Sequence, residues 1–75
     1  MSEDRFQRLR LLEALLFAAA EPQAPAVLAR HFPEGTDLEA LLGELQDLYA
    51  NRGVHLVRLG DRWAFRTAPD LAHAF

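Results

Sequence analysis

The hydrophobic pattern of this chain changes period once, near Gly53. Before that residue, apolar positions recur three and four apart, which is the spacing of the buried side of a helix. After it, two runs of alternating residues, 54–59 and 62–67, flank the turn dipeptide Gly60-Asp61. Because a two-stranded hairpin is not stable alone in water, this one must pack against the helices. The sequence therefore predicts helices first, then one hairpin, around a shared core.

Proline and glycine divide the helical part into three segments. The first is predicted over 5–20 and ends at Glu21-Pro22, because Pro restricts the residue before it. The second is predicted over 25–32, with Pro25 in its first turn, where a missing N–H costs nothing. The core side of the first helix is predicted to hold Leu9, Leu12, Leu15, Leu16 and Ala19. That of the second is predicted to hold Val27, Leu28 and Phe32.

The third helix is the most clearly marked. Thr36 is the expected N-cap, and Glu39 three residues later completes a capping box. Asn51-Arg52-Gly53 ends the helix, with Gly53 able to adopt the left-handed conformation. The apolar positions recur at i, i+3, i+4 and i+7, and they predict a buried side made of Leu38, Leu41, Leu42, Leu45, Leu48 and Tyr49.

The hairpin can be registered from its turn. A two-residue turn at 60–61 places Leu56 opposite Phe65, Val57 opposite Ala64 and Arg58 opposite Trp63. The side expected to pack on the helices holds Val54, Leu56, Trp63 and Phe65, and Ala68-Pro69-Asp70 ends the second strand. Three helices followed by a two-stranded wing form a winged helix-turn-helix, a mainly α fold with a β-hairpin. We predict one such domain over residues 1–75.

The residues needed for catalysis or for holding a metal are scarce. Ser2 is the only serine, and without cysteine there is no thiol nucleophile or thiolate ligand. His31, His55 and His73 fall on three different elements, without the spacing of a metal site. The four glycines are isolated, so there is no glycine-rich phosphate loop. The sequence predicts no enzyme, no metal, no cofactor and no small-molecule ligand.

The charge distribution argues against a recognition helix for DNA. The chain has eight arginines and eleven acidic residues, which gives a net charge of −3. The outer side of the third helix is expected to carry Asp37, Glu39, Glu44, Gln46 and Asp47, and no basic residue lies between positions 37 and 51. Such a surface repels phosphates, so sequence-specific DNA binding is not expected.

The wing keeps one route to DNA open. Arg58, Arg62 and Arg66 could make weak phosphate contacts, although exposed arginines on a hairpin commonly only guard its edge. A winged-helix transcription regulator that contacts DNA through its wing is therefore the alternative function. A membrane role is not expected, because the longest apolar run, 14–20, is too short to span a bilayer and the N-terminus lacks the pattern of a signal peptide.

The chain has more apolar residues than its core needs. Phe6 and Phe17 share one side of the first helix, away from Leu12 and Leu15. Val57, Leu59 and Ala64 point away from the packed side of the hairpin. Either a partner covers these residues or the chain wraps them itself. We predict a partner surface made of these five residues, with Arg58, Arg62 and Arg66 at its rim or in weak phosphate contact.

Two sequence runs resemble a known family. LEALLFAAAEP at 12–22, and RGVHLVRL at 52–59 followed by WAFRT at 63–67, are similar to the opening helix and the wing of segregation and condensation protein B. The resemblance covers residues 7–74. At 23–25 this chain has Gln-Ala-Pro where relatives often have Leu-Ser, so the second helix is expected to lack a side-chain cap. The wing tip at 60–62 has fewer glycines than is usual in the family.

The resemblance implies a non-enzymatic bacterial protein of the cytoplasm, associated with the nucleoid. Family members carry two winged-helix domains. This chain is similar to the first and stops within an incipient helix, as expected of a fragment. The family works with the kleisin, segregation and condensation protein A, and with the structural-maintenance-of-chromosomes ATPase. Together they form the bacterial condensin in chromosome condensation and segregation. The N-terminal domain makes the homodimer in the family, so we expect this domain to be a homodimerisation module.

Overall fold

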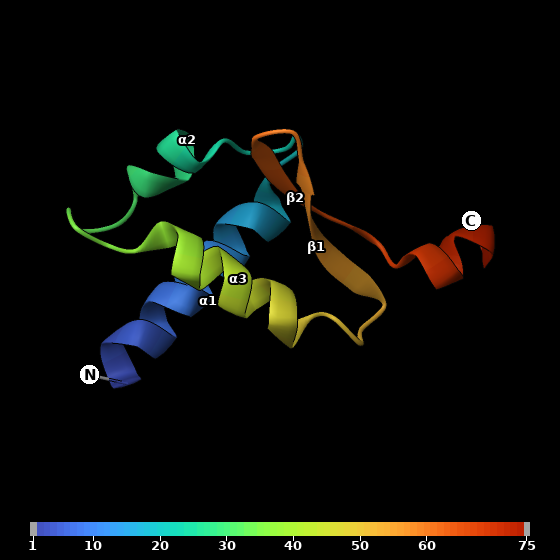
Figure 1. Ribbon diagram of the computed structural model, residues 1–75, viewed down its shortest axis with the longest axis horizontal. Coiled ribbons are helices and arrows are strands. Elements are labelled where there is room, and N and C mark those ends of the chain that lie inside the picture. The colour runs from blue at the N-terminus through green and yellow to red at the C-terminus, as the bar shows by residue number, and fades with distance from the viewer. Residues whose placement is uncertain (1, 75) are drawn as a thin grey trace.

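The computed structural model describes residues 2–74 and has the predicted mainly α fold with one hairpin. Two long helices, α1 and α3, cross in the centre, and the hairpin stands at one end of them (Figure 1). A 3₁₀ segment near the C-terminus projects beyond the hairpin. The elements are α1 (Ser2–Ala18), α2 (Pro25–Ala29), α3 (Leu38–Leu48), β1 (Val54–Leu59), β2 (Arg62–Thr67) and η1 (Pro69–Ala74).

Helix α1 buries the side that the sequence predicts. Leu12 is fully buried, Leu9 and Leu16 are nearly so, and Leu15 and Ala19 are half-buried. The helix runs for 17 residues, beginning before the expected position 5 and ending two residues before the expected end. No Gly or Pro interrupts it, which allows the long uninterrupted run.

Helix α2 is shorter than predicted, because it ends at Ala29. Pro25 opens it, and Ala24 at the N-cap makes no side-chain hydrogen bond, as the departure from the family pattern predicts. The next residues bond three positions back, with the Phe32 amide donating to the Ala29 carbonyl. Leu28 is buried and Phe32 packs on the core. Val27 is exposed, which corrects its placement in the core, because a helix of about one turn buries only one position well.

Helix α3 starts one residue later than a Thr36 cap requires. The Asp37 side chain accepts the Ala40 amide at 3.1 Å and is the N-cap. The Thr36 hydroxyl instead donates to the Pro33 carbonyl at 2.7 Å. The predicted capping box is therefore wrong, because an Asp one residue on satisfies the first-turn amide and the threonine hydroxyl is held in the preceding turn.

The end of α3 also differs from the prediction. Tyr49 is the C-cap, and hydrogen bonds between residues three apart carry the chain to Arg52. The described residues with positive φ are Gly35 and Gly60, so Gly53 does not adopt the left-handed conformation. Leu48 keeps the core spacing but is 54% exposed, which corrects its assignment to the core. Leu48 borders an open groove that Phe6 and Arg10 of α1 also line.

The wing has the predicted register. Leu56 pairs with Phe65, Val57 with Ala64 and Arg58 with Trp63. Gly60 takes φ +68° in the turn, a conformation that costs glycine little. Leu56 is buried, but Val54, two residues before it on the same side of the strand, is 41% exposed, so its predicted packing is wrong. Val54 is the first residue of β1.

Three kinds of contact fasten the wing to the helices. Gln23 adds one residue to the sheet, because its amide and carbonyl bond the carbonyl and amide of Trp63 at 2.8 and 2.9 Å. The Gln46 side chain of α3 donates to the Leu56 carbonyl at 3.0 Å. The third contact is the shared core, which consists of Leu9, Leu12, Leu16, Leu28, Leu41, Leu42, Leu45, Leu56 and Trp63.

Candidate protein-interaction surface

The outer side of α1 is unusually apolar for an exposed helix side. Phe17 is 82% exposed and Phe6 59% exposed. Leu11, also on α1, and Leu48, at the end of α3, are exposed as well. We call the exposed side of α1 around Phe6, Arg10, Glu13 and Phe17 the helix surface. Two exposed phenylalanines on one helix side make this side a candidate binding surface.

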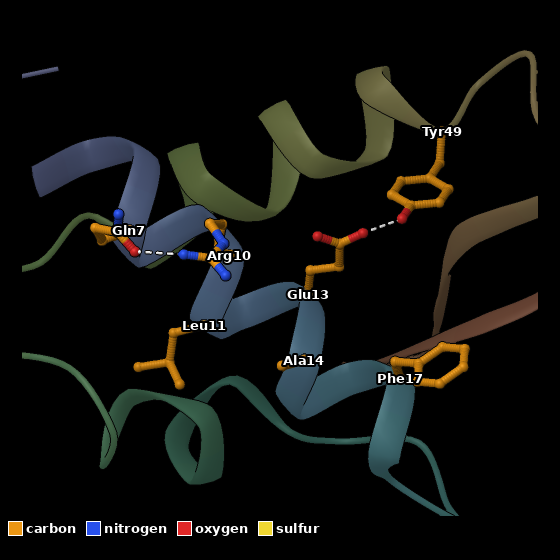
Figure 2. A pocket seen from close by; sticks show the side chains of 7 residues that line it. All are labelled: Gln7, Arg10, Leu11, Glu13, Ala14, Phe17 and Tyr49. Atoms are coloured by element: carbon orange, nitrogen blue, oxygen red, sulfur yellow. Dashed lines mark hydrogen bonds between the residues drawn. The ribbon is translucent and has the colours of Figure 1, made fainter. Parts of the chain in front are cut away.

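A groove of about 640 Å³ runs along the helix surface. Figure 2 shows Arg10 and Glu13 between Gln7 and Phe17 along α1, with Tyr49 reaching from the end of α3 to Glu13. The Arg10 guanidinium donates to the Gln7 side-chain oxygen at 2.9 Å. Charged groups therefore occupy the middle of the surface, and the two phenylalanines lie toward its ends.

Tyr49 joins three elements beside this groove. Its hydroxyl donates to the Glu13 carboxylate of α1, and its ring centroid lies 5.0 Å from that of Phe65 in the wing. The Arg52 guanidinium stands 5.5 Å from the centre of the tyrosine ring. The hydrogen bond to Glu13, and then burial, raise the pKa of Tyr49 above its ordinary 10.0. Glu13 is thus held in place near the middle of the helix surface.

The outer side of the wing is the second predicted surface. Leu59 is 42% exposed, and Val57 and Ala64 are half-buried. Arg62 and Arg66 are exposed and alternate with Ala64 along β2, so they flank it on the same side. This side of the hairpin, which we call the wing surface, is smaller in apolar content than the helix surface and more basic.

Arg58 lies on the other side of the hairpin from Val57. Its guanidinium stands 5.9 Å from the centre of the Trp63 ring, and its Nε donates to the Gly60 carbonyl at 3.1 Å. Arg58 therefore lies on the opposite side of the hairpin from Arg62 and Arg66. The alternation of side chains along a strand could have predicted this separation.

The structure gathers some of the five predicted residues and separates others. Phe17 and Ala64 border one cavity of about 300 Å³ between the end of α1 and the wing. Phe6 is 11 residues before Phe17, about 16 Å away along the helix axis. Leu59 is at the wing tip. The predicted set thus spans two surfaces rather than one patch.

Sequence reasoning missed two exposed leucines, Leu48 and Leu11. Leu48 shares an open groove of about 360 Å³ with Phe6, but its spacing matches the core pattern and gave no sign of exposure. Leu11 lies about 140° around α1 from Phe6, outside the core side, so helical periodicity could have identified it.

The outer side of α3 is acidic, as predicted. Asp37, Glu39 and Asp47 are exposed, and no basic residue occurs in Leu38–Leu48. Glu44 is partly neutralised by Arg5 of α1, with a nitrogen–oxygen distance of 2.5 Å. In residues 2–74, no three His, Cys, Asp or Glu side chains gather as a metal site would require. No helix in the described part of the chain has the length and apolar character to cross a membrane.

The helices and the hairpin form a winged-helix domain with exposed apolar side chains on α1. The model of the family described as "Segregation and condensation complex subunit ScpB" matches residues 10–75. This chain belongs to that family.

One relative agrees with this family assignment, and one solved structure agrees with the fold. A segregation and condensation protein B homolog of Coxiella burnetii is 36% identical over 67 residues, which cover 83% of this chain and 32% of that protein. The crystal structure of a conserved hypothetical protein from Chlorobium tepidum superimposes with a TM-score of 0.83 at 30% identity, over 99% of this chain and 49% of the other. The chain thus spans less than half the length of these relatives.

Proposed function

We propose that this domain is a non-enzymatic part of the bacterial condensin and that it joins two copies of the chain. Its family membership supports a role in chromosome segregation and condensation. The observation that carries the dimer is the exposure of two phenylalanines, Phe6 and Phe17, on a helix whose opposite side is already used by the core. Burial of such side chains against a second copy supplies the driving force for association.

The partners follow from the same proposal. The full protein would act with the kleisin, segregation and condensation protein A, and with the structural-maintenance-of-chromosomes ATPase, in the cytoplasm at the nucleoid. The domain contributes connection rather than chemistry, and no cofactor or small-molecule ligand enters its role. A second copy, by joining two such assemblies, doubles the number of partner sites held together.

DNA contact through the wing has less support. The helix that would enter the major groove presents Asp37, Glu39 and Asp47. On the wing, Arg58 is engaged with Trp63 and Gly60, which leaves Arg62 and Arg66 as the free cations of the predicted trio. Two cations release few counterions, so any binding would be weak and strongly reduced by salt.

Light scattering over a concentration series tests the proposal. We expect the mass to rise toward twice the 8.5 kDa of one chain. A mass that stays at the monomer value up to millimolar concentration would remove the dimer role. A gel shift with duplex DNA at low salt tests the alternative function. Arg62→Glu is the variant, and Arg30→Glu, at the C-cap of α2, is its charge-matched control. Binding lost in the first variant alone would favour the wing.

A further inference from the structure

The helix surface has a pattern that matches itself when reversed. Along α1 the residues Phe6, Arg10, Glu13 and Phe17 are separated by four, three and four positions. At 100° per residue, all four fall within about 60° of one another. The midpoint of the pattern lies between positions 11 and 12. An aromatic residue stands at each end, and opposite charges stand on the two sides of the midpoint.

A two-fold axis through that midpoint would make the pattern complementary. In an isologous dimer, every contact between positions i and j is repeated between j and i. Two antiparallel copies of α1 would place Phe6 against Phe17 and Arg10 against Glu13, each pair occurring twice. A parallel arrangement would place Arg10 on Arg10 and Glu13 on Glu13, and like charges repel at such distances.

We propose that the occupant of the helix surface is the helix surface of a second copy, with the two α1 helices antiparallel and Arg10 of each copy paired with Glu13 of the other. This inference rests on the proposed homodimer and specifies its geometry. The phenylalanines supply apolar burial at both ends, and the two charge pairs set the direction of the helices.

The surroundings of Glu13 suit it to this pairing. The Tyr49 hydroxyl occupies one carboxylate oxygen, Oε2, which holds the side chain in position and leaves Oε1 for a guanidinium. The Arg10 Nη1 donates to Gln7 within its own helix, and the other guanidinium nitrogens have donors to spare. Both groups are thus oriented before association, so less side-chain freedom is lost when the pair forms.

The apolar ends are also matched. The groove of about 360 Å³ beside Phe6 is bordered by Leu48 and Tyr49 of α3. In the antiparallel arrangement, Phe17 of the second copy arrives at this groove. Phe17 is 82% exposed in the single chain, so it has the most to gain from being covered.

The wing surface is the weaker site for a second copy. Arg62 and Arg66 flank Ala64 on the same side of β2. Two wing surfaces facing each other would bring four arginines together. Asp61, at the turn, is the one acidic residue of each hairpin that could offset their charge. Like charges opposed across an interface disfavour it.

Reversing one charge at a time tests the geometry. Arg10→Glu gives each homodimer two Glu–Glu contacts, and Glu13→Arg gives it two Arg–Arg contacts. We expect each variant alone to raise the dimer dissociation constant by about tenfold or more at low salt. Mixed in equal amounts, the two variants have opposite charges at both contacts, so we expect a heterodimer of near wild-type affinity.

Matched variants separate this effect from net charge and from folding. Arg8→Glu, on another side of α1, and Glu39→Arg, on α3, make the same charge changes outside the helix surface. Both variants are expected to leave the dimer unchanged. Circular dichroism checks that Glu13→Arg, which loses the Tyr49 bond, stays folded. The doubly reversed Arg10→Glu/Glu13→Arg chain is expected to dimerise again.

The outcomes distinguish the two proposals. If wild-type chain dimerises and neither charge reversal weakens it, the antiparallel helix pairing is wrong while the dimer role stands. If the mixture associates no better than its components, the pairing of Arg10 with Glu13 is wrong. If the wild-type chain is monomeric, both proposals fail.

Discussion

Helices α1 and α3 cross in the same core, but they treat their outer sides differently. On α3 the buried Leu41, Leu42 and Leu45 oppose a side with exposed Glu39 and Asp47, as on an ordinary surface helix. On α1 the core side is equally complete, yet the outer side carries Phe6 and Phe17. The outer side of α3 is polar and can stay in contact with water, whereas α1 has apolar side chains that the folded domain leaves exposed.

That difference is the reason why we propose contact with protein, rather than with DNA, for this winged-helix domain. The third helix is the element that winged-helix DNA readers place in the groove, and in this chain it is the acidic one. The spare binding capacity lies on α1 instead. The fold therefore fixes where surfaces are available, and the side chains on each surface decide the kind of partner.

The largest expected effect separates the two sides of α1. Leu12→Ala removes a fully buried side chain and is expected to lower the free energy of unfolding by about 3 kcal/mol. Phe17→Ala removes an exposed ring and is expected to change it by less than about 0.5 kcal/mol. Urea unfolding at a concentration where the chain is monomeric measures both, because association would otherwise add stability. Equal losses would mean that the chain itself covers the outer side of α1.

The start of α3 gives the next largest effect. Asp37→Ala leaves the Ala40 amide without its side-chain acceptor and is expected to cost about 1 kcal/mol. Thr36→Val loses only the bond to the Pro33 carbonyl, and is expected to cost less. Thermal unfolding followed by circular dichroism compares the two. A larger loss in the Thr36 variant would restore the capping box and contradict the observed cap.

The bond that links the two helices predicts a pH dependence. Because its hydrogen bond to Glu13 raises the pKa of Tyr49, the folded chain holds that proton more tightly than the unfolded chain does. The stabilisation is complete below pH 10.0 and is lost as the pH rises from there through the folded pKa. The chain has one Tyr and neither Cys nor Lys, so no other side chain normally titrates near that pH.

Tyr49→Phe provides the matched comparison. It removes the hydroxyl and keeps the ring against Phe65, so we expect a loss of about 1 kcal/mol or less at neutral pH. The stability of the variant should stay flat between pH 9.5 and 11, roughly the range in which tyrosine titrates. Urea midpoints measured across this range decide the matter. A parallel decline in both proteins would show that the Tyr49–Glu13 bond is not its cause.

The smallest effect is expected on the outer side of α3. Glu39→Ala removes an exposed carboxylate that packs against nothing in the core, so unfolding should change by less than about 0.5 kcal/mol and association should be unaffected. The same unfolding and light-scattering assays apply. A marked change in the dimer would move the interaction surface from α1 to α3.

Several predictions were wrong because they depended on contacts that a local sequence pattern does not reveal. Thr36 and Asp37 are both good cap residues, and the contact of Thr36 with Pro33 decided between them. Leu48 and Val54 keep the spacing of buried residues, but each lies at the end of its element and is exposed. Helix α2 ended early because three residues continued in tighter turns. Periodicity predicts which side of a helix or strand faces the core. How far along the element that side is buried depends on the neighbouring elements.

The order of helices and strands, the hairpin register and the core sides of α1 and α3 could all be predicted from the sequence. Each follows from short-range rules, since a turn dipeptide sets pairing and apolar spacing sets a side. The exposure of Leu48 and Val54 and the hydrogen bond from the Tyr49 hydroxyl to Glu13 became evident only in the folded structure. Those outcomes depend on which elements meet and where they stop, and such contacts join residues far apart in the chain.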